Sequence, residues 1–431
     1  MGRRNIEYSN RINQNDIEDN ESIALNNKDK NKLKIKLFIW IILTIFVGYQ
    51  VYTMITYTLG MRDKEKMWLY NSVNSFVGMF ITKAPNQTVE NYSLKIAALG
   101  DIYLTSNSLS GAKTGSTYDF STGIDDVSQK LKDYDLVIAS LNTPVADSLS
   151  YSAKSVYNAP IELLDTLKEL NISVVATANQ HSMDKNENGI IQTEKALKDK
   201  EISQVGISSE TRNDPVVITK NNISIGILSY TTDTNVSIKA SKDYLVNIFE
   251  EDNIKKDIEY LKSKNVDYII SYLYVPNENS TIPNSKQKEC VDTLFNNGVN
   301  VVLGTGSNVV QDTEEDLIKV NDKDTHIYAA YGLGDFMGSY DTADNRVNAI
   351  VNIEFTKDIT KNKKGEVIGT STEMKTKDQI GIWTQFSTKH VKTMYIISNE
   401  IEKYNNDTSK LTAKEYNELK EANDRLMELF K

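Results

Sequence analysis

From residue 93 onward, short apolar runs of the strand type alternate with segments of helical periodicity. The expected strands are 94–99, 136–141, 174–178, 223–230, 266–274, 299–303, 326–331 and 349–355. The expected helices are 125–132, 160–170, 192–200, 251–264 and 285–297. Regular alternation of this kind is typical of layered α/β domains with a largely parallel or mixed sheet. The sequence therefore predicts an α/β protein.

Polar residues follow several of these strands, and the segment after 174–178 is the richest of them. It reads Asn179-Gln180-His181-Ser182-Met183-Asp184 and is closed by Gly189. Open α/β sheets place ligand sites at the carboxyl ends of their strands. One interpretation is a site shared with other strand ends, with His181 at its centre. In the other interpretation, His181 bonds within its own loop, Asp184 caps the next helix and Gly189 makes a turn.

The composition excludes several classes of protein. The chain has 431 residues, of which 39% are hydrophobic and 25% are charged, which is a globular composition. Its formal net charge is -10 and it has no basic stripe, so a nucleic-acid partner is not expected. Cys290 is the single cysteine, which rules out an intrachain disulfide and a cysteine-based zinc site.

An uncharged run, Leu37–Leu59, precedes the α/β pattern and has the roughly 20 residues that a helix needs to cross a bilayer. Lysines gather just before it, so the positive-inside rule places the N-terminus in the cytoplasm and the main domain outside the cell. A cleaved signal peptide is the alternative, but Tyr57–Gly60 is a poor cleavage site. We therefore expect a single-pass cell-membrane anchor. The expected organisation is a disordered cytoplasmic tail, a transmembrane helix, a stalk, the α/β domain and a C-terminal extension, over residues 1–36, 37–59, 60–92, 93–356 and 357–431.

The C-terminal extension breaks the α/β rhythm. Residues 357–378 are charged and are expected to form a loop, with a turn at Lys363–Gly365. Residues 391–398 are expected to form a last strand. Residues 412–431 are expected to form a helix that starts with Thr412 as cap and Glu415 three positions on. Its apolar stripe packs on the domain or on a second copy.

The strand-end motifs, taken in order, resemble the CapA family of capsule and poly-γ-glutamate synthesis proteins. The resemblance runs from about Leu94 to Phe355. It rests on Gly100-Asp101, Ser140-Leu141-Asn142-Thr143-Pro144, Asn158-Ala159-Pro160, 178–184, Val205-Gly206, 274–278, Gln287, 304–308 and 332–336. It implies a layered sandwich like that of the calcineurin-type metallophosphoesterases, which use divalent metals.

The metal positions that the resemblance implies are only partly preserved. The family pattern supplies a two-metal site, which activates water and clamps phosphate, with a glutamate, an asparagine and three histidines among its residues. In this chain those positions are occupied by Asn142, Gln180, Tyr274, Thr305 and Asn308. Asp101, His181 and Asp184 keep the family's residue types.

The resemblance implies Asp101 and His181 as catalytic residues, and Asp101, Asn142, Gln180 and His181 as metal positions. Neutral amide and hydroxyl oxygens are weak ligands for transition metals, so we expect a divalent metal to be weakly bound or absent. A single hard ion held by Asp101, Asp335 and amides is the alternative. Glu278 and Gln287 are expected at the surface or in loops. Tyr272 and Tyr274 either pack in the core or stack on a sugar or peptide.

Three functions remain open. The first is a membrane-anchored, extracytoplasmic CapA-like protein that serves synthesis or export of an anionic envelope polymer without competent catalysis. The second is a cell-surface metallophosphoesterase-like hydrolase built on Asp101 and His181. The third is a scaffold that assembles other envelope-polymer synthesis proteins. The acidic net charge counts against direct capture of an anionic polymer.

Overall fold

The computed structural model describes residue 44 and residues 87–320, 322–338, 342–376, 379–386 and 392–429. The chain divides into two compact units, Met1–Ser75 and Phe76–Lys431, and every strand and helix below belongs to the second. The expected tail and all of the expected span except Thr44 lie outside the described residues. None of the described helices is both long enough and apolar enough to cross a membrane.

The first of two large mixed sheets has the strand order β19-β18-β16-β1-β4-β7-β8, with β15 beside β1 and β17 beside β16. β1 is parallel to β4 and β15, and antiparallel to β16. The strands are β1 (Thr88–Ile102), β4 (Leu136–Leu141), β7 (Ile172–Ala176), β8 (Ser203–Val205), β15 (Asp335–Met337), β16 (Val347–Lys361), β17 (Val367–Thr376), β18 (Ile380–Phe386) and β19 (Lys392–Ile396).

The second sheet has the order β13-β14-β12-β11-β10-β9. Its strands are β9 (Val216–Lys220), β10 (Ile223–Thr231), β11 (Tyr268–Tyr274), β12 (Val301–Thr305), β13 (Thr313–Val320) and β14 (Lys323–Ala330). Two small hairpins stand apart from both sheets, namely β2 (Lys113–Thr114) with β3 (Thr117–Tyr118), and β5 (Ser152–Lys154) with β6 (Val156–Asn158).

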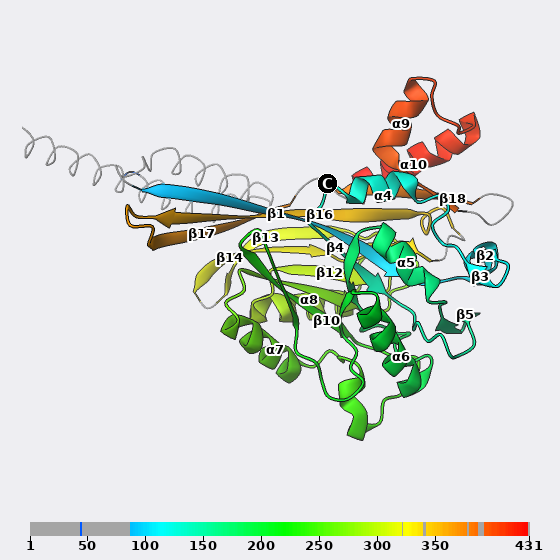
Figure 1. The fold of residues 1–431 in the computed structure, drawn as a ribbon. Coiled ribbons are helices and arrows are strands. Elements are labelled where there is room, and N and C mark those ends of the chain that lie inside the picture. The colour runs from blue at the N-terminus through cyan, green and yellow to red at the C-terminus, as the bar shows by residue number, and fades with distance from the viewer. Residues whose placement is uncertain are drawn as a thin grey trace, which may run out of the picture. The chain divides into compact units, whose positions relative to one another are not determined.

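Helices cover the outer face of each sheet (Figure 1). Apolar residues of α4, α5 and α6 pack on the first sheet, and those of α7 and α8 pack on the second. The two C-terminal helices, α9 and α10, pack against β16 and β18 around Trp383. The helices are α3 (Ser106–Gly111), α4 (Asp125–Leu131), α5 (Glu162–Glu169), α6 (Asn186–Asp199), η1 (Ala240–Leu245), α7 (Glu251–Ser263), α8 (Ser285–Asn297), α9 (Ile397–Asn405) and α10 (Ala413–Leu429).

An apolar layer lies between the two sheets. It joins Leu94, Ile96 and Ala98 of β1 to residues of β10, β11, β12 and β14. Alternate residues along each strand face this layer, because successive side chains of a strand point to opposite sides of the sheet. The arrangement is therefore helices, sheet, sheet, helices. It confirms the expected layered α/β fold with mixed sheets.

Several local expectations differ from the structure. Residues 357–376 of the segment expected to be a loop belong to a long hairpin, in which β16 and β17 pair around the expected turn at Lys363–Gly365. β1 begins at Thr88, inside the segment expected to be stalk. Gly189 lies inside α6 and makes no turn, since this helix begins six residues before the expected 192.

The expected C-terminal strand and helix are confirmed as β19 and α10. The Thr412 hydroxyl accepts from the Glu415 N–H, and Glu415 accepts from the Thr412 N–H, which is the expected cap. The apolar stripe of the helix packs on its own domain through Leu419, Ala422 and Leu426.

Replacement of Phe355 by alanine tests the inter-sheet layer. Phe355 is fully buried, and its ring lies 4.3 Å from that of Tyr268 on the second sheet. Phe355→Ala is expected to lower the free energy of unfolding by about 3–5 kcal/mol, because it removes apolar contacts and leaves a cavity. Denaturant unfolding measures the loss. Val367→Ala, on the exposed part of β17, is the control and should change stability by less than about 0.5 kcal/mol.

Candidate functional site at the strand ends

Strand ends from both sheets meet at one edge of the sandwich. Asp101 lies at the end of β1, opposite Asp335 of β15 in the strand register. Gly100 makes this approach possible, because a Cβ at that position would lie 1.8 Å from the carbonyl oxygen of Gly334. The Asp101 N–H donates to that same oxygen at 3.2 Å. The backbones of the two glycine-containing motifs, Gly100-Asp101 and 332–336, are therefore in direct contact.

Asp101 is buried, with 1% of its surface exposed. Its Oδ1 accepts from the Ser140 hydroxyl at 2.6 Å, and its Oδ2 accepts from the Gly306 N–H at 3.1 Å. Burial raises the pKa of this carboxyl to about 6, while the two hydrogen bonds and the nearby His181 act in the opposite direction. The carboxylate thus joins a strand of the first sheet to the loop after β12 in the second.

Three of the substituted family positions lie together. The Tyr274 hydroxyl donates to Oε1 of Gln180 at 2.8 Å, and the Asn142 side chain lies close to the same phenol. Tyr274 is 3% exposed, and burial, followed by the charges of Asp101, Glu278 and Asp335, raises its pKa well above the usual value. The phenol is therefore neutral at physiological pH. It lies among side chains from the ends of β4, β7 and β11.

His181 is paired with a buried carboxylate beside this group. Its Nδ1 lies 2.6 Å from Oδ2 of Asp184 and 2.8 Å from Nδ2 of Asn235. Asn235 also donates to Oδ1 of Asp184, and the Tyr157 N–H donates to Oδ2. Asp184 therefore orients His181 and does not cap α6, whose N-terminus has no side-chain cap. A histidine held by a carboxylate is an arrangement suited to proton transfer.

Two tyrosines connect this pair to Asp335. The Tyr157 ring lies 4.1 Å from the His181 ring and 5.3 Å from the Tyr103 ring. The Tyr103 hydroxyl donates to Oδ2 of Asp335 at 2.6 Å. Desolvation and the charges of Asp335, Asp184 and Glu278 raise the pKa of Tyr157. The site thus holds three buried carboxylates among neutral phenols and amides.

These residues do not fit a pair of transition-metal ions. Among the described residues, no three His, Cys, Asp or Glu side chains are placed to share a metal ion. The donors next to Asp101 are amide, hydroxyl and phenol groups, which bind such metals weakly. Oδ1 of Asn142 is buried with no hydrogen-bond partner among these residues. A water molecule ordinarily satisfies a buried oxygen of this kind.

Other motif residues have structural roles. Asn158 accepts from the Ala146 N–H and donates to carbonyl oxygens of 146–150, so it fixes that loop. Asn179 donates to the carbonyl oxygen of Leu141 and so joins the ends of β4 and β7. Gln287, expected at the surface, is instead buried and completes the capping box of α8. Glu278 is exposed, as expected.

The two tyrosines considered as stacking platforms are both core residues. Tyr272 is 2% exposed, and its hydroxyl contacts the carbonyl oxygens of Leu99 and Ile138 at 3.0 Å each. Tyr274 is buried in the group described above. Neither ring presents a face to a ligand, so the packing interpretation is the correct one.

Four residues of this site had no expected site role. Ser140 opens the recognised motif 140–144, and Tyr103 lies two positions after Asp101, so their sequence neighbours indicated them. Tyr157 precedes the Asn-Ala-Pro motif directly. Asn235 lies in the loop after β10 and carries no sequence signal, because the fold alone brings it to His181.

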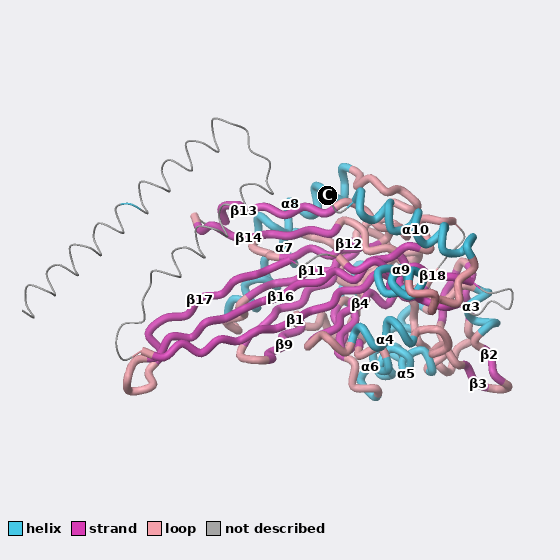
Figure 2. The backbone as a smooth tube through the Cα atoms, turned by 90° about the horizontal axis from the view of Figure 1, so that it is seen from above, coloured by secondary structure: helices cyan, strands magenta, loops and turns pink. Residues whose placement is uncertain are grey.

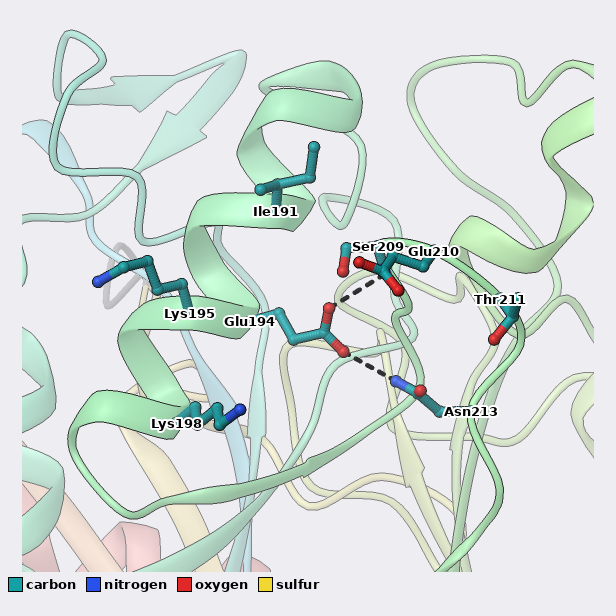
Figure 3. Close-up of a pocket in the computed structure, with 8 residues that line it drawn as sticks. All are labelled: Ile191, Glu194, Lys195, Lys198, Ser209, Glu210, Thr211 and Asn213. Carbon is teal, nitrogen blue, oxygen red and sulfur yellow. Dashed lines mark hydrogen bonds between the residues drawn. The ribbon is translucent and has the colours of Figure 1, made fainter.

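A separate surface pocket of about 440 Å³ lies beside α6 (Figure 3). Glu194 accepts from the Ser209 N–H and from Asn213 in this pocket, and so fixes the loop before β9. The pocket shares none of its lining residues with the strand-end site. Those residues are Ile191, Glu194, Lys195, Lys198, Ser209, Glu210, Thr211 and Asn213.

The sandwich and its strand-end cluster define an α/β protein with a polar site between two sheets. Residues 95–340 match the family described as bacterial capsule synthesis protein PGA_cap. The match covers more than half of the 431 residues, so the chain belongs to this family. The expected CapA resemblance is confirmed. A search of the curated proteins finds no match.

Solved structures with a similar arrangement come from Thermus thermophilus. A 5'-nucleotidase precursor from this organism shows 14% identity and a TM-score of 0.35 over 66% of this chain and 54% of its own. The sulfate thiohydrolase SoxB shows 8% identity and a TM-score of 0.33 over 65% and 56%. The protein TT1561 shows 8% identity and a TM-score of 0.33 over 66% and 98%. The chain thus spans about half the length of the first two.

Replacement of Tyr274 by phenylalanine tests the hydrogen-bonded group. The variant keeps the ring but leaves Oε1 of Gln180 without its hydrogen-bond donor. The free energy of unfolding should fall by about 1–3 kcal/mol, because buried polar groups lose a hydrogen bond. Tyr244→Phe is the control, since the Tyr244 hydroxyl has no hydrogen bond to any described residue. If Tyr274→Phe and Tyr244→Phe have equal free energies of unfolding, the hydrogen bond assigned to the Tyr274 hydroxyl is contradicted.

The buried Asp101 carboxyl makes stability depend on pH. Its pKa in the folded protein, about 6, lies above the ordinary value of 3.8, so folding favours its protonated form. The stability from this group is therefore complete only well below the ordinary pKa of 3.8 and is lost as the pH rises through 6. Asp101→Asn removes the titration. Between pH 4 and pH 7, the wild type should lose about 2 kcal/mol of unfolding free energy relative to this variant. If the difference in unfolding free energy between the wild type and Asp101→Asn does not change with pH, the raised pKa of Asp101 is contradicted.

Proposed function

We propose that the chain is a membrane-anchored, extracytoplasmic protein that serves synthesis or export of an anionic envelope polymer without metal-dependent catalysis. Membership of the capsule synthesis family supports the process. The layers of the sandwich are, in this proposal, those of a calcineurin-type metallophosphoesterase. The finer claims concern the missing catalysis and the anchor, and each has its own support.

The single observation that carries the loss of catalysis is the position of the Tyr274 phenol. It donates a hydrogen bond to Gln180 and lies close to Asn142, two positions at which the family pattern has an asparagine and a glutamate. A phenol whose pKa is raised further by burial is a weaker ligand for divalent metals than the imidazole of the family pattern. Its proton is instead shared with the Gln180 amide.

The anchor rests on the sequence. The run 37–59 is uncharged, and lysines precede it. By the positive-inside rule, this places the two-sheet unit outside the cytoplasm, where envelope polymers are assembled. In that position, the protein acts as a binding or scaffold subunit for other polymer-synthesis proteins.

A hydrolase is the second candidate, and one observation favours it. The His181–Asp184 pair keeps a geometry suited to proton transfer, with Nδ1 and Oδ2 2.6 Å apart. Tyr157 and Asn235 contact the same pair and hold it in place.

Metal content separates the two candidates. Full-length protein is incubated with Mn²⁺, Zn²⁺ or Fe²⁺, dialysed, and analysed for bound metal and for hydrolysis of a generic phosphodiester. Well below one ion per chain and no hydrolysis are expected, because the strong ligands are too few. His181→Ala should leave both results unchanged.

His326→Ala is the matched control, since His326 pairs with Glu315 on the β13–β14 hairpin, outside the site. About one bound ion or more per chain, lost together with activity in His181→Ala but not in His326→Ala, would establish the hydrolase instead.

A further inference from the structure

Three strands continue past the helix-covered part of the sandwich as a ribbon. It consists of 88–93 of β1, 356–361 of β16 and 367–372 of β17, which run side by side in both views (Figures 1 and 2). Thr88 pairs with Lys361, and Lys361 pairs with Val367, so all three strands end at one level. We call this end, with the turn 362–366 and Val367 and Ile368, the ribbon tip.

Ion pairs hold the ribbon in a fixed position. Lys361 contacts Glu90 at 2.7 Å across the β1–β16 pair, and Asn91 donates to Asp358 at 2.6 Å. Lys357 contacts Asp267, at the edge of the second sheet, at 2.8 Å. The last contact joins the ribbon to the domain itself. The tip is therefore a defined feature of the surface.

The tip combines exposed apolar side chains with lysines. Val367 is 59% and Ile368 is 50% exposed, and they are neighbours among the few large apolar side chains exposed in the described part of the chain. Lys363 and Lys364 are exposed in the turn, and neither forms an ion pair with a described residue. With Glu366 as its one carboxylate, the tip has two positive charges and one negative charge, on a chain whose net charge is -10. Lysines combined with exposed aliphatic side chains suit the interface of an anionic bilayer.

The path of the chain points to the same surface. Thr88, at the tip, is the first residue of β1, so the chain enters the sandwich there. The uncharged run that is expected to span the bilayer ends at Leu59, fewer than thirty residues earlier. A tether of that length keeps the tip at a high effective concentration near the bilayer, so a weak contact is sufficient.

We propose that the ribbon tip rests on the anionic lipid surface of the membrane that anchors the chain. Lys363 and Lys364 contact lipid phosphates or carboxylates, and Val367 and Ile368 enter the headgroup region. The proposal rests on the membrane anchor of the proposed function. It adds a second contact, which fixes how the sandwich is oriented on the membrane.

Site-specific fluorescence tests the contact. Full-length Lys364→Cys is labelled with a fluorophore, which the fully buried Cys290 does not take up, and is reconstituted in phosphatidylcholine nanodiscs with or without phosphatidylserine. Lipids with headgroup nitroxides should quench the probe in the anionic discs. Quenching should fall at high salt, because salt screens surface charge. Lys113→Cys, an exposed position on the β2–β3 hairpin, is the matched control and should not be quenched.

Charge reversal gives the second readout. Each lysine near an anionic surface strengthens binding about fivefold. With the probe moved to Thr370→Cys, an exposed position of the ribbon, the double variant Lys363→Glu and Lys364→Glu should therefore lose most of its quenching, and Ile368→Asn should lose part of it. These side chains are exposed, so the variants should fold as the parent does. An unquenched tip probe in a chain that is inserted in the disc would overturn the proposal and leave the anchor intact.

If the tip binds a polymer or a second copy of the chain instead of lipid, the same experiments give different results. Quenching that free polyglutamate abolishes would assign the lysines to a polymer. A tip signal that depends on protein concentration and not on lipid charge would assign them to a second copy. A chain that does not insert at all would refute the anchor. In that case, the tip proposal survives only if the same labelled chain binds free phosphatidylserine vesicles through the tip. If it does not bind them, the tip proposal fails as well.

Discussion

The face-to-face packing of the two sheets is the constraint on which the site depends. Strands of both sheets contribute to one apolar layer, and Tyr272 crosses it to reach carbonyl oxygens of β1 and β4. These hydrogen bonds fix the position of one sheet relative to the other. As a result, the carboxyl ends of β1, β4, β7, β11 and β12 open at the same edge. Asp101 can then bond both Ser140 of one sheet and Gly306 of the other.

The sequence predicted the strands with long buried apolar runs and missed several others. β17 was missed because nearly all of its residues are exposed, so it has no apolar period to detect. β18 was missed although Ile382 and Trp383 are buried. α6 starts before its expected first residue because Asn186, Asn188 and Gly189 are poor helix formers, and packing decides their conformation. Asp101, Asn142, Gln180 and His181 were identified as site positions from the sequence motifs. Asn235 was not, because it reaches His181 from 54 residues away through a long connection.

The substitutions in the site are connected to one another. Asn142, Gln180 and Tyr274 come from three strand ends, yet they lie together, and the Tyr274 hydroxyl donates to Gln180. The substitutions also remove a carboxylate that would otherwise be buried near Asp101 and Asp335. Without metal cations, a further buried charge of the same sign would raise the cost of folding. A phenol and two amides add no buried charge at these strand ends.

β1 connects this site with the ribbon tip. Thr88 is at the ribbon tip and Asp101 is at the site, so the strand spans the distance between them. At about 3.3 Å per residue, the two ends are separated by roughly 40 Å. If the tip lies on the bilayer, the strand-end site lies on the far side of the domain from the lipid. A site in that position faces a polymer or a partner protein in the envelope and is out of reach of lipid headgroups. The family's process, the position of the site and the lysines of the tip are then consistent with a subunit that presents its strand ends away from the membrane.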